Sequence, residues 1–270
     1  MATESDRIAE RPRVIALANQ KGGVGKTTTA INLGAGLAAA GLKTLIIDMD
    51  PQGNASTGLG IDAADREQTT YDVMVGGAGL ASVARATPVP GLSVAPSAVD
   101  LTGAEVELAR AEGRERRLKD ALKQAPLDVD YVLIDCPPSL TLLTLNALVA
   151  ADAVMVPLQC EFYALEGLGH LLGTIKRVKR ALNPDLRMQG VVLTMYDRRN
   201  AICGSVADDV RGHLGATVYD TVIPRNVRVS EAPSFGQPVM IYDHRCAGAQ
   251  AYAHLAGEML RRDRRAGAAA

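Results

Sequence analysis

The sequence contains no tryptophan, and aromatic side chains make up only 3% of its 270 residues. A folded core must therefore be built from aliphatic side chains, which 47% hydrophobic residues can supply. The four cysteines, Cys136, Cys160, Cys203 and Cys246, stand far apart and form no C-x-x-C pair. This spacing argues against a zinc ribbon, a thioredoxin-type site and a disulfide scaffold.

The sequence also lacks a strong excess of one charge and a long hydrophobic run. Its formal net charge is −1, which excludes a uniformly basic DNA-coating protein but leaves room for a local basic face. No stretch approaches the 18 or so apolar residues that a membrane-spanning helix needs. Residues 1–12 are polar and resemble no signal peptide. We therefore expect a soluble cytoplasmic protein.

Short apolar runs rich in β-branched residues alternate with segments of helical length. This alternation predicts a single α/β domain, with a mostly parallel twisted sheet covered by helices on both faces. We expect a polar leader at 1–12, the domain at 13–262 and a disordered tail at 263–270. The predicted strands are 14–18, 44–47, 131–134, 153–156, 191–194 and 218–223. The predicted helices are 27–40, 104–123, 139–150, 165–182, 205–214 and 247–262, and 75–96 is predicted to be mostly loop.

A glycine-rich loop between the first strand and the first helix is the strongest functional signal. It reads N-Q-K-G-G-V-G-K-T-T over residues 19–28. Gly22, Gly23 and Gly25 allow the backbone to curl so that its N–H groups point at a phosphate, and the helix N-terminus adds partial positive charge. Lys26 can reach the β- and γ-phosphates, and the Thr27 hydroxyl can bind Mg²⁺. The loop predicts a P-loop NTPase.

This loop departs from the usual Walker A pattern, because Gln20 stands where that pattern has glycine and Lys21 follows it. In this form the sequence resembles the deviant Walker A motif of the ParA/MinD superfamily of dimeric ATPases, and most closely the small, Soj-like ParA proteins. The resemblance implies that Lys21 reaches across an ATP-bound homodimer to the partner's phosphates. It also implies that ATP is bound by Gly22, Gly23, Val24, Gly25, Lys26, Thr27 and Thr28.

Acidic residues follow two of the predicted strands. Asp48 and Asp50 lie two residues apart after the strand at 44–47, a spacing that suits Mg²⁺ binding and orientation of a water molecule. Asp135 ends the strand at 131–134, as in a Walker B motif. The resemblance places Asp48 and Asp135 around the magnesium ion, and it implies that Asp50 positions the attacking water. An Asp-Pro turn with capping roles is the structural alternative for residues 48–53.

The last third of the chain carries the remaining family signals. Residues 223–236, I-P-R-N-V-R-V-S-E-A-P-S-F-G, resemble the segment that holds adenine, which implies base contacts from Pro224 and Asn226. The resemblance also maps DNA-contacting arginines onto Arg199 and Arg228. A local mismatch after Arg199 leaves Arg198 as a possible substitute for it. A basic cluster such as 176–180 is equally well explained as a solvated surface.

The resemblance implies a slow Mg²⁺-dependent ATPase that segregates DNA. An ATP-bound homodimer would bind double-stranded DNA without sequence preference, on the nucleoid, until a ParB-type centromere-binding protein stimulates hydrolysis. Chromosome and plasmid cargo are not distinguished. The alternatives are a MinD-like, membrane-associated regulator of division and a ParA-like ATPase that positions another cargo. An iron–sulfur protein of the nitrogenase iron-protein type would need a second cysteine in the expected context, and we find none.

Overall fold

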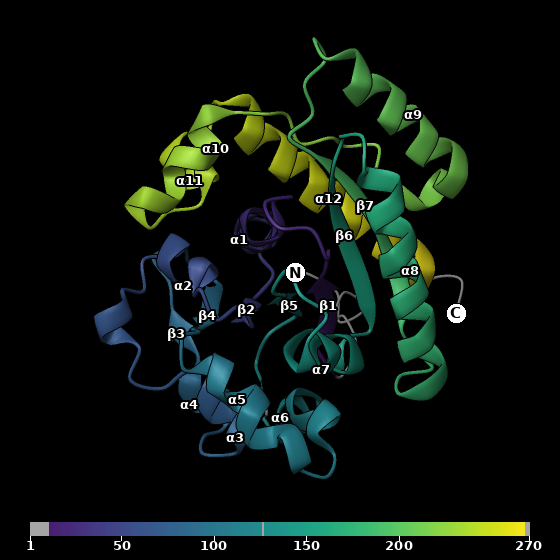
Figure 1. Cartoon of the computed structure of the whole chain (residues 1–270). Helices are drawn as coiled ribbons and strands as arrows, with labels where there is room; N and C mark the ends of the chain where they lie inside the picture. Colours follow the sequence, from purple (N-terminus) through teal and green to yellow (C-terminus); the bar gives the residue numbers. More distant parts are fainter. Residues whose placement is uncertain (1–10, 126, 268–270) are drawn as a thin grey trace.

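A seven-stranded sheet runs through the centre of the computed structural model, which describes residues 11–125 and 127–267 (Figure 1). The strand order is β3-β4-β2-β5-β1-β6-β7, and all neighbours are parallel except the antiparallel pair β3–β4. The strands are β1 (Arg13–Leu17), β2 (Thr44–Asp48), β3 (Arg85–Ala86), β4 (Leu92–Ala95), β5 (Tyr131–Asp135), β6 (Ala153–Gln159) and β7 (Arg187–Thr194). The predicted α/β fold with a mostly parallel sheet is confirmed.

Helices cover both faces of this sheet, which explains why the strands are apolar along their whole length. Alternate residues of β1 point to opposite faces: Ile15 and Leu17 join one buried core, and Val14 and Ala16 join the other. The first core is completed by α1 (Lys26–Ala39), α2 (Asn54–Gly58), α10 (Val227–Glu231), α11 (Val239–Tyr242) and α12 (Ala247–Gly267). The second is completed by α3 (Thr70–Val75), α4 (Leu80–Val83), α5 (Leu101–Glu107), α6 (Arg117–Gln124), α7 (Leu142–Ala150), α8 (Ala164–Ala181) and α9 (Ala201–Leu214).

The predicted strand at 218–223 is wrong. Backbone pairing with β7 occurs only near the two ends of this segment: Val218 forms an isolated bridge to Val191, and the Ile223 N–H donates to the Leu193 carbonyl at 2.8 Å. Between these points, the backbone N–H groups of Asp220 and Thr221 donate instead to the Glu258 carboxylate on α12 at 3.0 and 2.9 Å. A side chain from a helix has thus taken donors that a strand would have used in its ladder.

Two other segments also differ from the prediction. The expected helix at 104–123 is broken into α5 and α6 with two short 3-10 turns between them, and Gly113 in this break has a left-handed φ of 66°. The stretch at 75–96, expected to be mostly loop, contributes β3 and β4 to one edge of the sheet. Both errors arise where short elements depend on tertiary contacts more than on their own periodicity.

The last helix, α12, is longer than predicted. It runs to Gly267, so 263–267 continue the helix where a disordered tail was expected. Asp263 explains this, because its carboxylate accepts hydrogen bonds from Tyr131 (2.9 Å) and Gln189 (2.8 Å) of the sheet. The predicted leader at 1–12 lies, except for its last two residues, outside the described residues. In the described part of the chain, no helix is long and apolar enough to cross a membrane.

The sheet places three loops at one edge. Leu17, Asp135 and Asp48 lie in register on the adjacent strands β1, β5 and β2. The loops that follow these residues therefore leave the sheet side by side, at the carboxyl ends of the strands, where open α/β sheets bind their ligands. The predicted functional residues of the first half of the chain all lie at the ends of these strands, on these loops or at the start of α1.

Candidate nucleotide-binding site

The glycine-rich loop joins β1 directly to the N-terminus of α1. Gly23 and Gly25 have left-handed φ values of 74° and 86°, which glycine adopts without strain. Lys26 begins the helix and is only 6% exposed, and its Nζ donates to the Lys21 carbonyl at 3.1 Å. Burial lowers the pKa of Lys26, and the nearby Asp135 opposes this shift. The loop thus presents backbone N–H groups and a buried cation to the same space.

A cavity of about 590 Å³ opens beside this loop, a volume within the range of ligand sites. Most of its walls come from three parts of the chain: the loop with the start of α1, the segment after β2, and the segment from Ile223 to Pro233. Pro138, Thr194, Met195 and Tyr252 complete the lining. The predicted site residues that line it are Gly22, Gly23, Gly25, Lys26, Thr27, Thr28, Asp50, Pro224 and Asn226. Residues distant in sequence therefore meet at one site, as the predicted roles require.

Asp48 and Asp135 lie behind this cavity and are fully buried. Asp48 is held by Ser56, whose backbone N–H and hydroxyl donate to it at 3.0 and 2.7 Å. Burial raises the pKa of Asp48 to about 6 despite these hydrogen bonds. Burial and then the charge of Asp48 raise the pKa of Asp135 well above its usual range.

Asp135 also supplies a test of whether Mg²⁺ fits the site. Among the described residues, no donor forms a hydrogen bond of normal geometry with its two buried carboxylate oxygens, and the neighbouring Thr27 hydroxyl only partly offsets the rise in its pKa. Such a group is costly unless a cation or water completes it. No group of three His, Cys, Asp or Glu in the described ranges is arranged to hold a metal by itself. Because Mg²⁺ usually keeps several waters and binds phosphate oxygens, a site of Thr27 with Asp135 behind it fits this ion.

Two residues predicted to contact phosphate, Val24 and Lys21, do not line the cavity. The Val24 side chain is buried, and its carbonyl accepts a hydrogen bond from Thr194 at 2.8 Å, so only its backbone N–H is left to serve a phosphate. Lys21 is exposed and forms an ion pair with Glu161 of its own chain. Lys21 therefore points away from the site of its own chain.

The segment after Ile223 forms the far wall of the cavity. Asn226 caps α10, since its Oδ1 accepts the backbone N–H of Arg228 at 2.9 Å. The acceptor of its amide is therefore occupied, and its Nδ2 is the group left to meet a purine base. Pro224 lies next to Ile223 on the same wall and offers an apolar surface.

The two candidate DNA-contacting arginines lie on segments that are hydrogen-bonded to each other. The Tyr196 N–H donates to the Ile223 carbonyl at 2.9 Å, and the Arg225 N–H donates to the Tyr196 carbonyl at 3.1 Å. Arg199 and Arg228 each follow this junction by three residues. We call residues 196–200 and 224–228 the arginine surface. It adjoins the nucleotide cavity, since Pro224, Arg225 and Asn226 also line that cavity.

Several residues at the site were not predicted. Ser56 holds Asp48, Glu161 holds Lys21, and Tyr252 lines the cavity with its hydroxyl 3.3 Å from that of Thr29. No local motif marks Ser56 or Tyr252, because both reach the site from separate helices. Glu161, two residues after β6, had no role assigned from the sequence.

The chain matches the model of an AAA domain family (AAA_31) over residues 12–188. It is 62% identical over 254 residues to the chromosome partitioning protein ParA of Caulobacter vibrioides (strain NA1000 / CB15N), an alignment that covers 93% of this chain and 95% of that protein. The chain belongs to the ParA/Soj family. This membership confirms the resemblance carried by the deviant Walker A loop.

The chain is also similar to other proteins of this family and of this fold. The sporulation initiation inhibitor protein Soj of Bacillus subtilis is 53% identical over 247 residues, which cover 92% of this chain and 98% of that protein. The cobyrinic acid a,c-diamide synthase of Mycobacterium smegmatis, solved with a bound ATP analog and magnesium, superposes with a TM-score of 0.82. It is 40% identical, over 93% of this chain and 95% of that one.

Proposed function

We propose that this ParA/Soj family member is a Mg²⁺-dependent ATPase that partitions DNA. The observation that carries the proposal is the cavity of about 590 Å³, in which Lys26, Thr27 and Asp50 meet beside the arginine surface. A relative named as a chromosome partitioning protein is similar over nearly the whole chain. A structure similar over 93% of the chain contains an ATP analog and magnesium. Site chemistry and relatives thus favour the same function.

The residues of the cavity would each have a separate role in ATP hydrolysis. The loop N–H groups and Lys26 bind and orient the phosphates. Thr27 would hold Mg²⁺, with Asp48 and Asp135 in its outer shell, and the ion neutralises phosphate charge when bound. Asp50 stands at the cavity wall, where one carboxylate oxygen already accepts the Gln52 N–H at 3.0 Å. Its other oxygen can orient the attacking water.

Association of two copies would complete the site. Lys21 does not line the cavity of its own chain, and its ammonium group is held at the surface by Glu161. We infer that ATP binding lets Lys21 leave Glu161 and contact the phosphates bound by a second copy. Hydrolysis by a single copy would then be slow, because one of the cations that stabilise the transition state is missing.

The homodimer would bind double-stranded DNA without sequence preference. Arginine contacts to phosphates give affinity without base readout, and a dimer presents two arginine surfaces on one body. A ParB-type partner would stimulate hydrolysis and release the DNA, so that the protein cycles on and off the nucleoid in the cytoplasm. The names of the relatives support DNA partitioning, and the adjacency of the arginine surface to the cavity supports its control by nucleotide.

Fluorescence anisotropy of a random-sequence duplex, with ATP, with ADP and without nucleotide, tests this proposal. We expect binding with Mg²⁺-ATP only, an affinity that is indifferent to sequence, and a steep loss with added salt. Equal binding in all three states would contradict control by nucleotide. Absence of binding in every state would contradict the DNA-partitioning function itself.

A further inference from the structure

Both candidate DNA-contacting arginines are held by carboxylates of their own chain. The Arg199 side chain is 88% exposed and forms a two-pronged contact with Asp197: Nε donates to Oδ1 at 3.0 Å, and Nη2 donates to Oδ2 at 2.8 Å. The pKa of Asp197 is lowered to about 2 by its hydrogen bonds with Arg199. Asp197 thus occupies the Nε–Nη2 edge, one of the two edges through which a guanidinium can bind a phosphate with two N–H groups.

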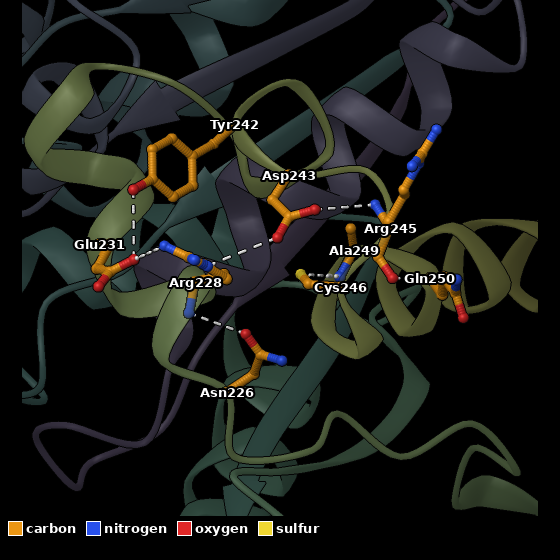
Figure 2. A network of polar contacts seen from close by, with 9 residues as sticks. All are labelled: Asn226, Arg228, Glu231, Tyr242, Asp243, Arg245, Cys246, Ala249 and Gln250. Atoms are coloured by element: carbon orange, nitrogen blue, oxygen red, sulfur yellow. Dashed lines mark hydrogen bonds and ion pairs between the residues drawn. The ribbon is translucent and has the colours of Figure 1, made fainter.

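Arg228 stands between two acids (Figure 2). Its Nη1 donates to Glu231 Oε2 at 2.9 Å, and its Nε lies 3.6 Å from Asp243 Oδ2. The two acids come from different elements, since Glu231 ends α10 and Asp243 follows α11. One positive charge therefore faces two negative ones, so this cluster presents a net negative charge to an approaching phosphate.

The two acids of this cluster are themselves held in place. The Tyr242 hydroxyl donates to the same Glu231 oxygen at 3.3 Å, and its ring stacks on Phe235 with centroids 4.9 Å apart. Asp243 accepts the backbone N–H of Arg245 at 3.1 Å, and the Arg245 side chain extends away from it in Figure 2. Glu231 and Asp243 are thus positioned beside Arg228 by the fold.

These carboxylates compete with DNA. Arg228 is 53% exposed, so DNA could reach it, but a phosphate would approach within a few ångströms of Glu231 and Asp243. Like charges at such distances repel, and the ion pairs must rearrange before the guanidinium can turn its donors to the phosphate. Each acid therefore reduces the affinity that its arginine would otherwise provide.

We propose that Glu231 and Asp243, together with Asp197, limit the DNA affinity of this chain by holding Arg228 and Arg199 in intramolecular ion pairs. The proposal rests on the proposed function, in which these arginines contact DNA. It adds that the resting affinity of the arginine surface is set low by acids of the same chain. A weak contact per copy makes DNA binding depend on having two copies together, which is the state that ATP would produce.

Glu231→Gln and Asp243→Asn test the proposal by anisotropy with Mg²⁺-ATPγS and a random-sequence duplex. These substitutions keep the shape of each side chain, and the amide oxygen introduced by Glu231→Gln can still accept from Tyr242. We expect each variant to bind about fivefold more tightly than the unsubstituted chain, the size of the coupling in an exposed ion pair. The double variant should bind more tightly still, with a steeper salt dependence because more phosphate contacts form.

Two controls separate release of Arg228 from a general change in charge. Glu67→Gln removes one exposed negative charge between η2 (Ala63–Asp65) and α3, and should leave DNA affinity nearly unchanged. In an Arg228→Ala background, Glu231→Gln should lose its effect, since the guanidinium that it frees is absent.

The outcomes are distinguishable from those that test the proposed function. If the unsubstituted chain binds no DNA in any nucleotide state, the proposed function fails. If it binds with ATPγS but Glu231→Gln and Asp243→Asn bind no more tightly, our inference is overturned. Weaker binding by these variants would mean that the acids position Arg228 for DNA. A persistent gain in the Arg228→Ala background would also overturn it, because the gain would then come from charge alone.

Discussion

The nucleotide cavity and the arginine surface adjoin each other, but they differ in how their charged side chains are buried and paired. Around the cavity, Asp135 and Asp48 are fully buried, and Asp135 has no hydrogen-bond partner among the described residues. On the arginine surface, Arg199 and Arg228 are exposed and already paired with acids. The buried site leaves the Asp135 carboxyl group without a well-formed hydrogen bond, and a ligand can supply the missing partner. On the exposed surface, acids of the same chain already pair with the two arginines, so a ligand must compete with these acids for the guanidinium groups.

Desolvation dominates at the nucleotide cavity, and screening by water and salt dominates at the arginine surface. Burial makes a single charge at the cavity energetically expensive, so each substitution there should change binding or catalysis strongly. Water and salt screen the charges at the surface, so each substitution there should have a modest effect that depends on ionic strength.

Asp50→Ala should cause the largest loss. We expect steady-state ATP hydrolysis to fall by about a hundredfold to ten-thousandfold, because this change removes the group that we propose orients the attacking water. Nucleotide affinity, measured by titration of a fluorescent ATP analogue, should change by much less. Asp65→Ala, at an exposed position in the η2 turn, is the matched control. Full activity of Asp50→Ala would remove this residue from the catalytic step.

Arg228→Ala should weaken binding of a random-sequence duplex by about tenfold with Mg²⁺-ATPγS, and it should reduce the salt dependence by loss of phosphate contacts. Arg199→Ala should behave similarly, and comparison with Arg198→Ala decides which arginine of that pair serves DNA. Arg110→Ala, at an exposed position after α5, controls for the loss of one positive charge. Equal losses in the control would show that only net charge matters.

Asp135→Asn should stabilise the nucleotide-free fold while impairing Mg²⁺-dependent nucleotide binding. The raised pKa of Asp135 means that its ionised form costs stability in the folded state, and asparagine removes this cost. We expect a gain of about 1–2 kcal/mol, which is about 2–8 °C in Tm by thermal unfolding. An unchanged or lower Tm would show that the carboxylate is stabilised in the nucleotide-free protein.

Glu161→Gln should have the smallest effect. The ion pair with Lys21 is partly exposed, so removing it should promote ATP-dependent self-association by at most about fivefold. Sedimentation velocity over a concentration series with ATPγS measures this. Glu166→Gln, on the first turn of α8, serves as the control. Weaker self-association of Glu161→Gln would mean that Glu161 positions Lys21 for the partner.

The sequence predicted the buried region better than the exposed one. Continuous apolar strands and the loop around Gly23 and Gly25 require a particular backbone, and both predictions hold. The strand expected at 218–223 failed because Glu258, distant in sequence, takes its N–H groups. Ser56 and Tyr252 reach the site only through tertiary packing, so no local pattern revealed them.

The ion pairs of the arginine surface also depend on contacts between residues that are distant in sequence. The sequence identified Arg199 and Arg228, but it did not reveal that acids hold them. Asp243 lies fifteen positions from Arg228 and meets it only because α10 and α11 fold together. A charged residue in a sequence is a candidate, and its partners in the fold decide how much of that charge a ligand can use.

The most direct test of the account links hydrolysis at the cavity to release at the arginine surface. One equivalent of ATP is added to the protein and a labelled duplex, and phosphate release and anisotropy are followed in the same sample. We predict that DNA is released no faster than phosphate appears, and that Asp50→Ala keeps both its ATP and its DNA. Release of DNA before hydrolysis, or equal release from Asp50→Ala, would contradict the claim that the nucleotide site controls DNA binding.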